Sequence, residues 1–178
     1  MRVYVPLTLP GLAEAYRTGE LGGARVTAYA VTPALSDWYE SEDSEELEYA
    51  ALGLAAYASL RLLAADPSAP RRRVVVAVDV ADRAVDLSPG EMGETLVPGP
   101  LRLARAAAVH VDAEDAGQDV TAAAAALDAA DKDDAEALDT VDRAAGHDLL
   151  WFATQEVPAL IGGGAGGEDR RDGEGGPA

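Results

Sequence analysis

The sequence predicts a single α/β domain over residues 1–161, with a mixed sheet of four to five strands packed by helices. Short β-branched segments alternate along it with amphipathic segments of helical period, in the order β-α-β-α-α-β-β-α-α-α. Among the predicted strands, only the segment 72–80 has five consecutive aliphatic residues, Val74–Val78. A two-layer ferredoxin-like sandwich is therefore favoured over a three-layer arrangement.

The first forty residues predict two strands and two helices. Pro6 lacks an N–H donor, so the first strand either ends there or lies at an edge of the sheet. Pro10 suits the first turn of a helix, where a missing N–H costs nothing. The expected elements are a strand at 2–8, a helix at 9–21, a strand at 25–32 and a short helix at 33–39.

The longest helix is predicted from Asp43 to about Ala65. Asp43 is the expected N-cap, and Glu46 three residues later completes a capping-box pattern. Apolar residues then recur at helical spacing. Pro67 ends the segment.

The second half of the chain begins with the most apolar strand. The middle of the segment 72–80, Val74–Val78, is continuously apolar and mostly β-branched, which indicates a central strand buried on both faces. Asp148 is expected to cap a last helix that Pro158 kinks or ends. The elements expected here are strands at 72–80, 95–97 (an edge) and 103–112, and helices at 119–131, 133–145 and 148–161.

The charge of the chain disfavours some classes of function, and its lack of cysteine excludes others. The chain carries 14 basic and 32 acidic residues, a net charge of −18, which repels phosphate backbones and anionic lipids. The absence of cysteine excludes disulfides and thiolate metal sites. No apolar run approaches the ~18 residues of a membrane span. We therefore expect a cytoplasmic protein that binds neither nucleic acid nor membrane.

The last segment, residues 162–178, differs from the rest of the chain. It holds eight glycines among charged residues and no aliphatic residue larger than alanine. Such a segment buries too little apolar surface to offset its ordering entropy. It is predicted to be a disordered, acidic, glycine-rich tail.

Motifs for catalysis and cofactors are absent from the sequence, so no cofactor is predicted and enzymatic activity stays open. No G-x-G-x-x-G follows a predicted strand, and the chain lacks the phosphate-loop pattern G-x-x-x-x-G-K-[ST], H-E-x-x-H and G-x-S-x-G. His110 and Asp112 are spaced to share one face of a strand, and Asp79 ends the neighbouring apolar strand. These three could hold a divalent metal or form an acid/base set. In the favoured alternative His110 packs as a neutral residue and Asp112 begins a loop.

Two features suit protein binding. Trp151 and Phe152, followed by Glu156, are expected on one short helix, where they would anchor an interface or fill the core. The segment 112–143 holds eleven acidic residues against two basic ones. It forms either a solvated helical face or a docking surface for a basic partner.

These features support two hypotheses of function. The first is a non-enzymatic cytoplasmic interaction or regulatory protein whose partner has a basic surface. The alternative is a small metal-dependent hydrolase that uses His110, Asp112 and Asp79.

Four segments also resemble an uncharacterised family of actinobacterial proteins. They are residues 1–8 (MRVYVPLT), 30–39 (AVTPALSDWY), 45–51 (EELEYAA) and 149–158 (LLWFATQEVP). The resemblance covers roughly residues 1–161 and omits the tail. It implies a bacterial cytoplasmic origin, in keeping with the single lysine among 14 basic residues, and no activity or site residue follows from it.

Overall fold

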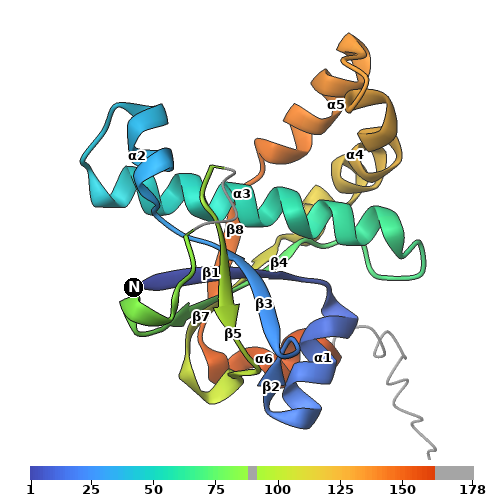
Figure 1. Ribbon diagram of the computed structural model, residues 1–178. Helices are drawn as coiled ribbons and strands as arrows, with labels where there is room; N and C mark the ends of the chain where they lie inside the picture. The colour runs from blue at the N-terminus through green and yellow to red at the C-terminus, as the bar shows by residue number, and fades with distance from the viewer. Residues whose placement is uncertain (88–91, 163–178) are drawn as a thin grey trace, which may run out of the picture.

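The computed structural model describes residues 1–87 and 92–162, and its centre is a six-stranded sheet (Figure 1). The strand order is β5-β3-β1-β4-β7-β8, and every neighbouring pair is antiparallel. Its strands are β1 (Arg2–Leu7), β3 (Arg25–Tyr29), β4 (Val74–Asp79), β5 (Glu94–Pro98), β7 (Ala106–Asp112) and β8 (Leu149–Phe152). A separate ribbon pairs β2 (Glu20–Leu21) with β6 (Leu101–Arg102).

Helices cover both faces of the sheet. The helices are α1 (Leu9–Thr18), α2 (Pro33–Tyr39), α3 (Ser44–Ala65), α4 (Gly117–Ala130), α5 (Ala135–Ala145) and α6 (Val157–Gly162). Short 3₁₀ turns are η1 (Asp82–Ala84), η2 (Leu103–Arg105), η3 (Glu114–Ala116) and η4 (Thr154–Glu156). The core on one face joins α2 and α3 to Tyr4, Val75 and Ala77. The core on the other joins α1, α6 and the β2–β6 ribbon to the alternate residues of the same strands.

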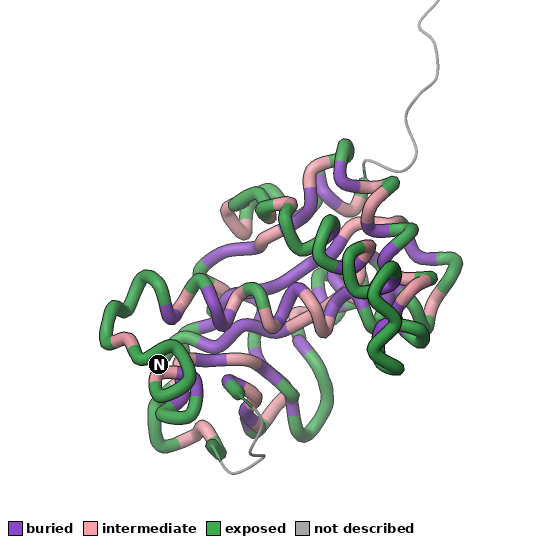
Figure 2. The backbone as a smooth tube through the Cα atoms, turned by 90° about the horizontal axis from the view of Figure 1, so that it is seen from above, coloured by how far each residue is buried: buried purple, intermediate pink, exposed green. Residues whose placement is uncertain are grey.

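A third cluster lies beside the sheet, where the α4–α5 hairpin packs on the C-terminal half of α3. Leu60 and Leu63 of α3 belong to one buried cluster with Val120 and Leu127 of α4 and Val141 of α5. Figure 1 shows this hairpin extending beyond the edge of the sheet. Buried residues follow the central strands and one side of α3, while much of the periphery is exposed (Figure 2).

The single α/β architecture is confirmed, but the two-layer mixed sheet is wrong. The sheet has more strands than expected, all antiparallel, and helices on both faces. β3 and β4 run in the same direction, since both are antiparallel to β1, but β1 lies between them. β3 and β4, which α2 and α3 link, therefore do not become neighbours, while the helix-linked pairs β1–β3 and β7–β8 are neighbours but antiparallel. No parallel pair forms within residues 1–87 and 92–162.

Pro6 does not place β1 at an edge, because β1 lies between β3 and β4. β1 pairs with β4 along its length, including Pro6 with Val75. Its register with β3 covers only the Tyr4–Tyr29 pair. The side of Pro6 that faces β3 therefore needs no N–H donor, and the proline is tolerated in a central strand.

The predicted helix over residues 148–161 is wrong in its first half. Leu149–Phe152 form β8, which pairs with β7. Pro158 lies in the first turn of α6 and so begins this helix instead of ending it. Four consecutive apolar residues fit either a strand or a buried helix, and the free edge of β7 decides between them.

Several local predictions are confirmed. Asp43 caps α3 through bonds from the backbone N–H groups of Glu45 and Glu46. The side chain of Glu46 accepts from Ser41 instead of closing the predicted capping box. β4 is central and buried, and β5 is the predicted edge strand. The predicted tail lies outside the described residues, apart from Gly162.

Within residues 1–87 and 92–162, α3 is the one helix that is long and apolar enough to cross a membrane. Its buried side, however, packs on the sheet and on the α4–α5 hairpin. These contacts account for its apolar composition as that of a core helix.

Candidate functional site

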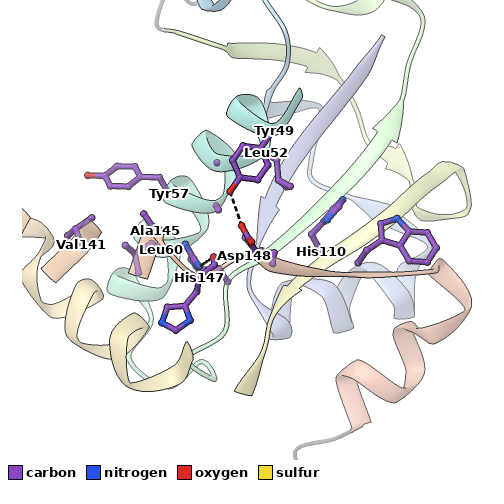
Figure 3. A pocket seen from close by; sticks show the side chains of 14 residues that line it. Tyr49, Leu52, Tyr57, Leu60, His110, Val141, Ala145, His147 and Asp148 are labelled. Carbon is purple, nitrogen blue, oxygen red and sulfur yellow. Dashed lines mark hydrogen bonds between the residues drawn. The ribbon is translucent and has the colours of Figure 1, made fainter. Parts of the chain in front are cut away.

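A cavity of about 350 Å³ opens between α3, strands β7 and β8, and the end of α5. Apolar side chains form most of its lining, and the residues with polar groups are Tyr49, Tyr57, Arg73, His110, His147, Asp148 and Trp151. In Figure 3, Tyr57 and Val141 lie at one end, His110 lies at the other, and Asp148 lies between them. We call this cavity the α3–β8 pocket.

The α3 wall of the pocket has a notch at a glycine. Tyr49, Gly53 and Tyr57 follow one another at four-residue spacing, so they share one stripe of the helix. A Cβ atom added at Gly53 would meet nothing within 4 Å. A glycine inside a helix makes the helix less stable than an alanine would, by roughly 0.5–1 kcal/mol. Packing within the described chain does not require a glycine at position 53.

The opposite wall of the pocket comes from the last two strands of the sheet. His110 and Trp151 are cross-strand partners, and Leu149 lies on the same face as Trp151. Trp151 is 62% exposed and Tyr49 66% exposed, so aromatic rings stand at both sides of the opening.

A hydrogen bond joins the two walls. The hydroxyl of Tyr49 donates to Oδ1 of Asp148 at 2.8 Å, from α3 to the residue that precedes β8 (Figure 3). This bond raises the pKa of the Tyr49 phenol, because the phenolate would meet the carboxylate charge. Asp148 is therefore a pocket residue and does not cap a helix as predicted.

The base of the pocket rests on a buried ion pair. Arg73 donates to Asp112 through Nε at 2.8 Å and Nη2 at 2.7 Å, and the two side chains are 4% and 0% exposed. The Arg73 Nη2 also donates to the carbonyl of His147 at 2.9 Å. Asp112, a predicted metal ligand, is thus a structural anchor for the link between α5 and β8.

Asp79 lies far from Asp112. β4 and β7 are antiparallel, with Val78 opposite Ala106 and Val74 opposite Val111, so the two aspartates lie at opposite strand ends. At about 3.3 Å per residue the separation is roughly 15–20 Å, beyond the reach of one ion with ligands at about 2–2.6 Å.

Asp79 binds Arg2 instead, at 3.0 and 3.1 Å, and Arg2 lowers the pKa of this carboxyl. Among the described residues, no group of three or more His, Asp or Glu side chains is placed to hold a metal. The predicted site of His110, Asp112 and Asp79 therefore does not assemble.

His110 is half-buried in the pocket wall. Burial, with a smaller effect of Arg2, lowers the pKa of His110 below its ordinary value. Its ring lies 6.5 Å from that of Tyr4, whose pKa burial and the nearby Glu48 raise to about 12. His110 thus contributes a neutral polar group to the pocket, as the favoured alternative expected.

We expect His110 to titrate below pH 6.5 in the folded protein. As the pH falls, His110 then takes up a proton in the unfolded chain before it does so in the folded protein. The contribution of His110 to stability is therefore complete above its pKa in the unfolded chain, and it is lost as the pH drops toward its pKa in the folded protein. NMR titration of the imidazole protons measures the midpoint, and His110→Gln separates its signal from that of His147. A midpoint at or above 6.5 would contradict the burial of the neutral ring.

Comparison with known protein families identifies the family of this chain. A model of DUF6912, a family of unknown function, matches residues 1–161. The chain belongs to DUF6912. No curated protein and no solved structure matches it. The expected membership of an uncharacterised family is confirmed, and the actinobacterial origin stays a prediction.

Of the three predicted interaction residues, only Trp151 reaches the pocket of this DUF6912 protein. Phe152 lies on the face of the sheet opposite α3 and packs against the core that includes α1 and α6. The carboxylate of Glu156 accepts from the N–H of Ala153 at 2.8 Å and caps η4. Tyr49 and Gly53 line the pocket but are not among the predicted site residues, and their four-residue spacing on a predicted helix is the sequence signal for a shared helix face.

Proposed function

We propose that this DUF6912 protein binds a partner protein, and that a large apolar side chain of the partner occupies the α3–β8 pocket. The observation that supports this most is Gly53, which lies inside the long helix α3. The fold has room for an alanine at this position, so the missing side chain serves to keep the pocket open. Glycine serves where another molecule must approach the backbone closely. A non-enzymatic, cytoplasmic role is part of this proposal.

The dimensions and the rim of the pocket suit the binding of an apolar side chain of the partner. A volume of about 350 Å³ lies in the range of pockets that hold compact ligands. Exposed Tyr49 and Trp151 flank the opening. Aromatic residues around a partly closed pocket are typical binding hot spots.

The charge around the pocket supports a basic partner. Asp148 lies on the lining and Glu45 lies one helical turn before Tyr49. Among the described residues that line the pocket, Arg73 is the one Lys or Arg, and it is already paired with Asp112. With the net charge of −18, this arrangement attracts a segment with lysine or arginine beside its apolar anchor.

The proposal is tested by selecting random linear peptides, displayed on phage, on the wild-type protein and on Gly53→Leu. The leucine side chain would occupy the notch, so we expect enriched peptides to bind this variant at least about tenfold more weakly. These peptides should carry an aromatic or large aliphatic residue near a basic one. Binding is measured with Trp38→Phe as background, which leaves Trp151 as the fluorescent reporter.

Gly117→Leu is the matched control, because a Cβ at Gly117 also meets nothing within 4 Å and this residue lies outside the pocket. It should bind the peptides like the wild type. Equal binding to Gly53→Leu and wild type, or no enrichment on either, would overturn the proposal.

Gly53→Ala is expected to stabilise the protein by roughly 0.5–1 kcal/mol, because α3 gains helix propensity without a clash. Urea denaturation measures this change. A loss of stability would mean that the glycine is required by the fold, and the argument for a binding notch would fail.

A further inference from the structure

We infer that the partner segment binds as an added β-strand on the free edge of β8, with alternate side chains directed toward α3. This inference rests on the proposed function, since the added strand carries the side chain that enters the α3–β8 pocket. Three observations support the inference: the hydrogen-bond pattern of β7 and β8, the composition of β8 and the position of the pocket.

β8 is the last strand of the sheet, and within the described chain it pairs only with β7. The N–H of Asp112 donates to the carbonyl of Arg73, so Asp112 and, two residues before it, His110 direct their backbone groups toward β4. Val111 and Val109 therefore direct theirs toward β8, where they pair with Leu150 and Phe152.

By the same alternation, Leu149 and Trp151 direct their backbone N–H and C=O groups away from β7, toward the free edge. The side chains of these two residues also line the α3–β8 pocket. A strand added to this edge would place every second side chain on the α3 face, beside Trp151 and next to the notch. The edge and the pocket thus form one recognition surface for an extended segment.

The two edges of the sheet differ in protection. The β5 edge contains Glu94 and Pro98, and Asp86 already pairs with Leu96 through two backbone hydrogen bonds. β8 is Leu-Leu-Trp-Phe, without a charge or a proline, and its Leu150 and Trp151 are 47% and 62% exposed. An edge of this kind favours pairing with another chain.

Charge favours a basic segment of another protein over a second copy of this chain. Pairing β8 with itself would bring together two chains of net charge −18 each. A segment with lysine or arginine would instead meet the carboxylate of Asp148, the residue that precedes β8.

The experiment scans the backbone of a peptide selected on the wild type, with one N-methyl group placed at each position in turn. If the peptide adds a strand, methylation should weaken binding about tenfold at alternate positions and hardly at all between them. In the protein, hydrogen exchange of the Leu149 and Trp151 amides should slow on binding. Leu149→Pro, which removes an outward N–H, should weaken binding more than Leu149→Ala.

The outcomes separate this inference from the proposed function. Peptides that need Gly53 but show no alternation would leave the pocket proposal intact and overturn strand addition. No peptide binding at all would overturn both. A concentration-dependent dimer without peptide, abolished by Leu149→Pro and kept in Leu149→Ala, would assign the edge to a second copy and overturn the inference.

Discussion

Asp112→Ala is expected to lower the free energy of unfolding by about 3–5 kcal/mol, because it leaves the buried Arg73 guanidinium without its counter-charge. Asp112 is fully buried and accepts both side-chain and backbone bonds from Arg73. Urea denaturation followed by circular dichroism measures the change. The same variant should loosen the link between α5 and β8, since Arg73 also binds the His147 carbonyl.

The matched control is Asp79→Ala, which breaks a second bidentate arginine–aspartate pair at a strand end. Arg2 and Asp79 are 39% and 60% exposed, so water replaces the lost partner and the expected loss is below about 1 kcal/mol. Equal effects of the two substitutions would contradict the structural role assigned to Asp112.

Ser59→Ala is expected to cost about 2–4 kcal/mol, because one hydroxyl serves two backbone groups. Ser59 is fully buried, donates to the carbonyl of Leu7 at 2.6 Å and accepts from the N–H of Val74 at 3.0 Å. It thereby joins α3 to the paired ends of β1 and β4. Removing the hydroxyl leaves a buried donor and a buried acceptor without this partner, at roughly 1–3 kcal/mol each.

Thermal and urea unfolding of Ser59→Ala test this expectation, with Ser68→Ala as the control. Ser68 is exposed and bonds Asp66 within the same turn, so its loss should lie within about 0.5 kcal/mol. A cost below about 1 kcal/mol at Ser59 would mean that the Leu7 carbonyl and the Val74 amide find other partners.

The candidate site could be predicted from the sequence only in part. The sequence predicts that Trp151 either anchors an interface or fills the core, and its exposure at the pocket rim contradicts the core alternative. Asp112 and Asp79 were grouped because adjacent strands were expected to bring them together, but antiparallel pairing separates them. A strand pattern specifies which face a residue occupies and leaves the direction of the neighbouring strand open.

The sequence by itself determined the elements whose signals are local. The cap at Asp43 and the apolar period specify α3, and continuous β-branched residues specify the buried strand β4. These signals depend on residues within one or two turns of each other, so they need no knowledge of the rest of the chain.

The tertiary structure alone decided the contacts between distant segments. Leu149–Phe152 became a strand because β7 offered an open edge, although the same residues suit a helix. The pocket formed because α3 and β8, about a hundred residues apart, were brought together, with Tyr49 bonded to Asp148. Such pairings depend on which edges and faces remain free after the other elements have packed, and no local pattern encodes that choice.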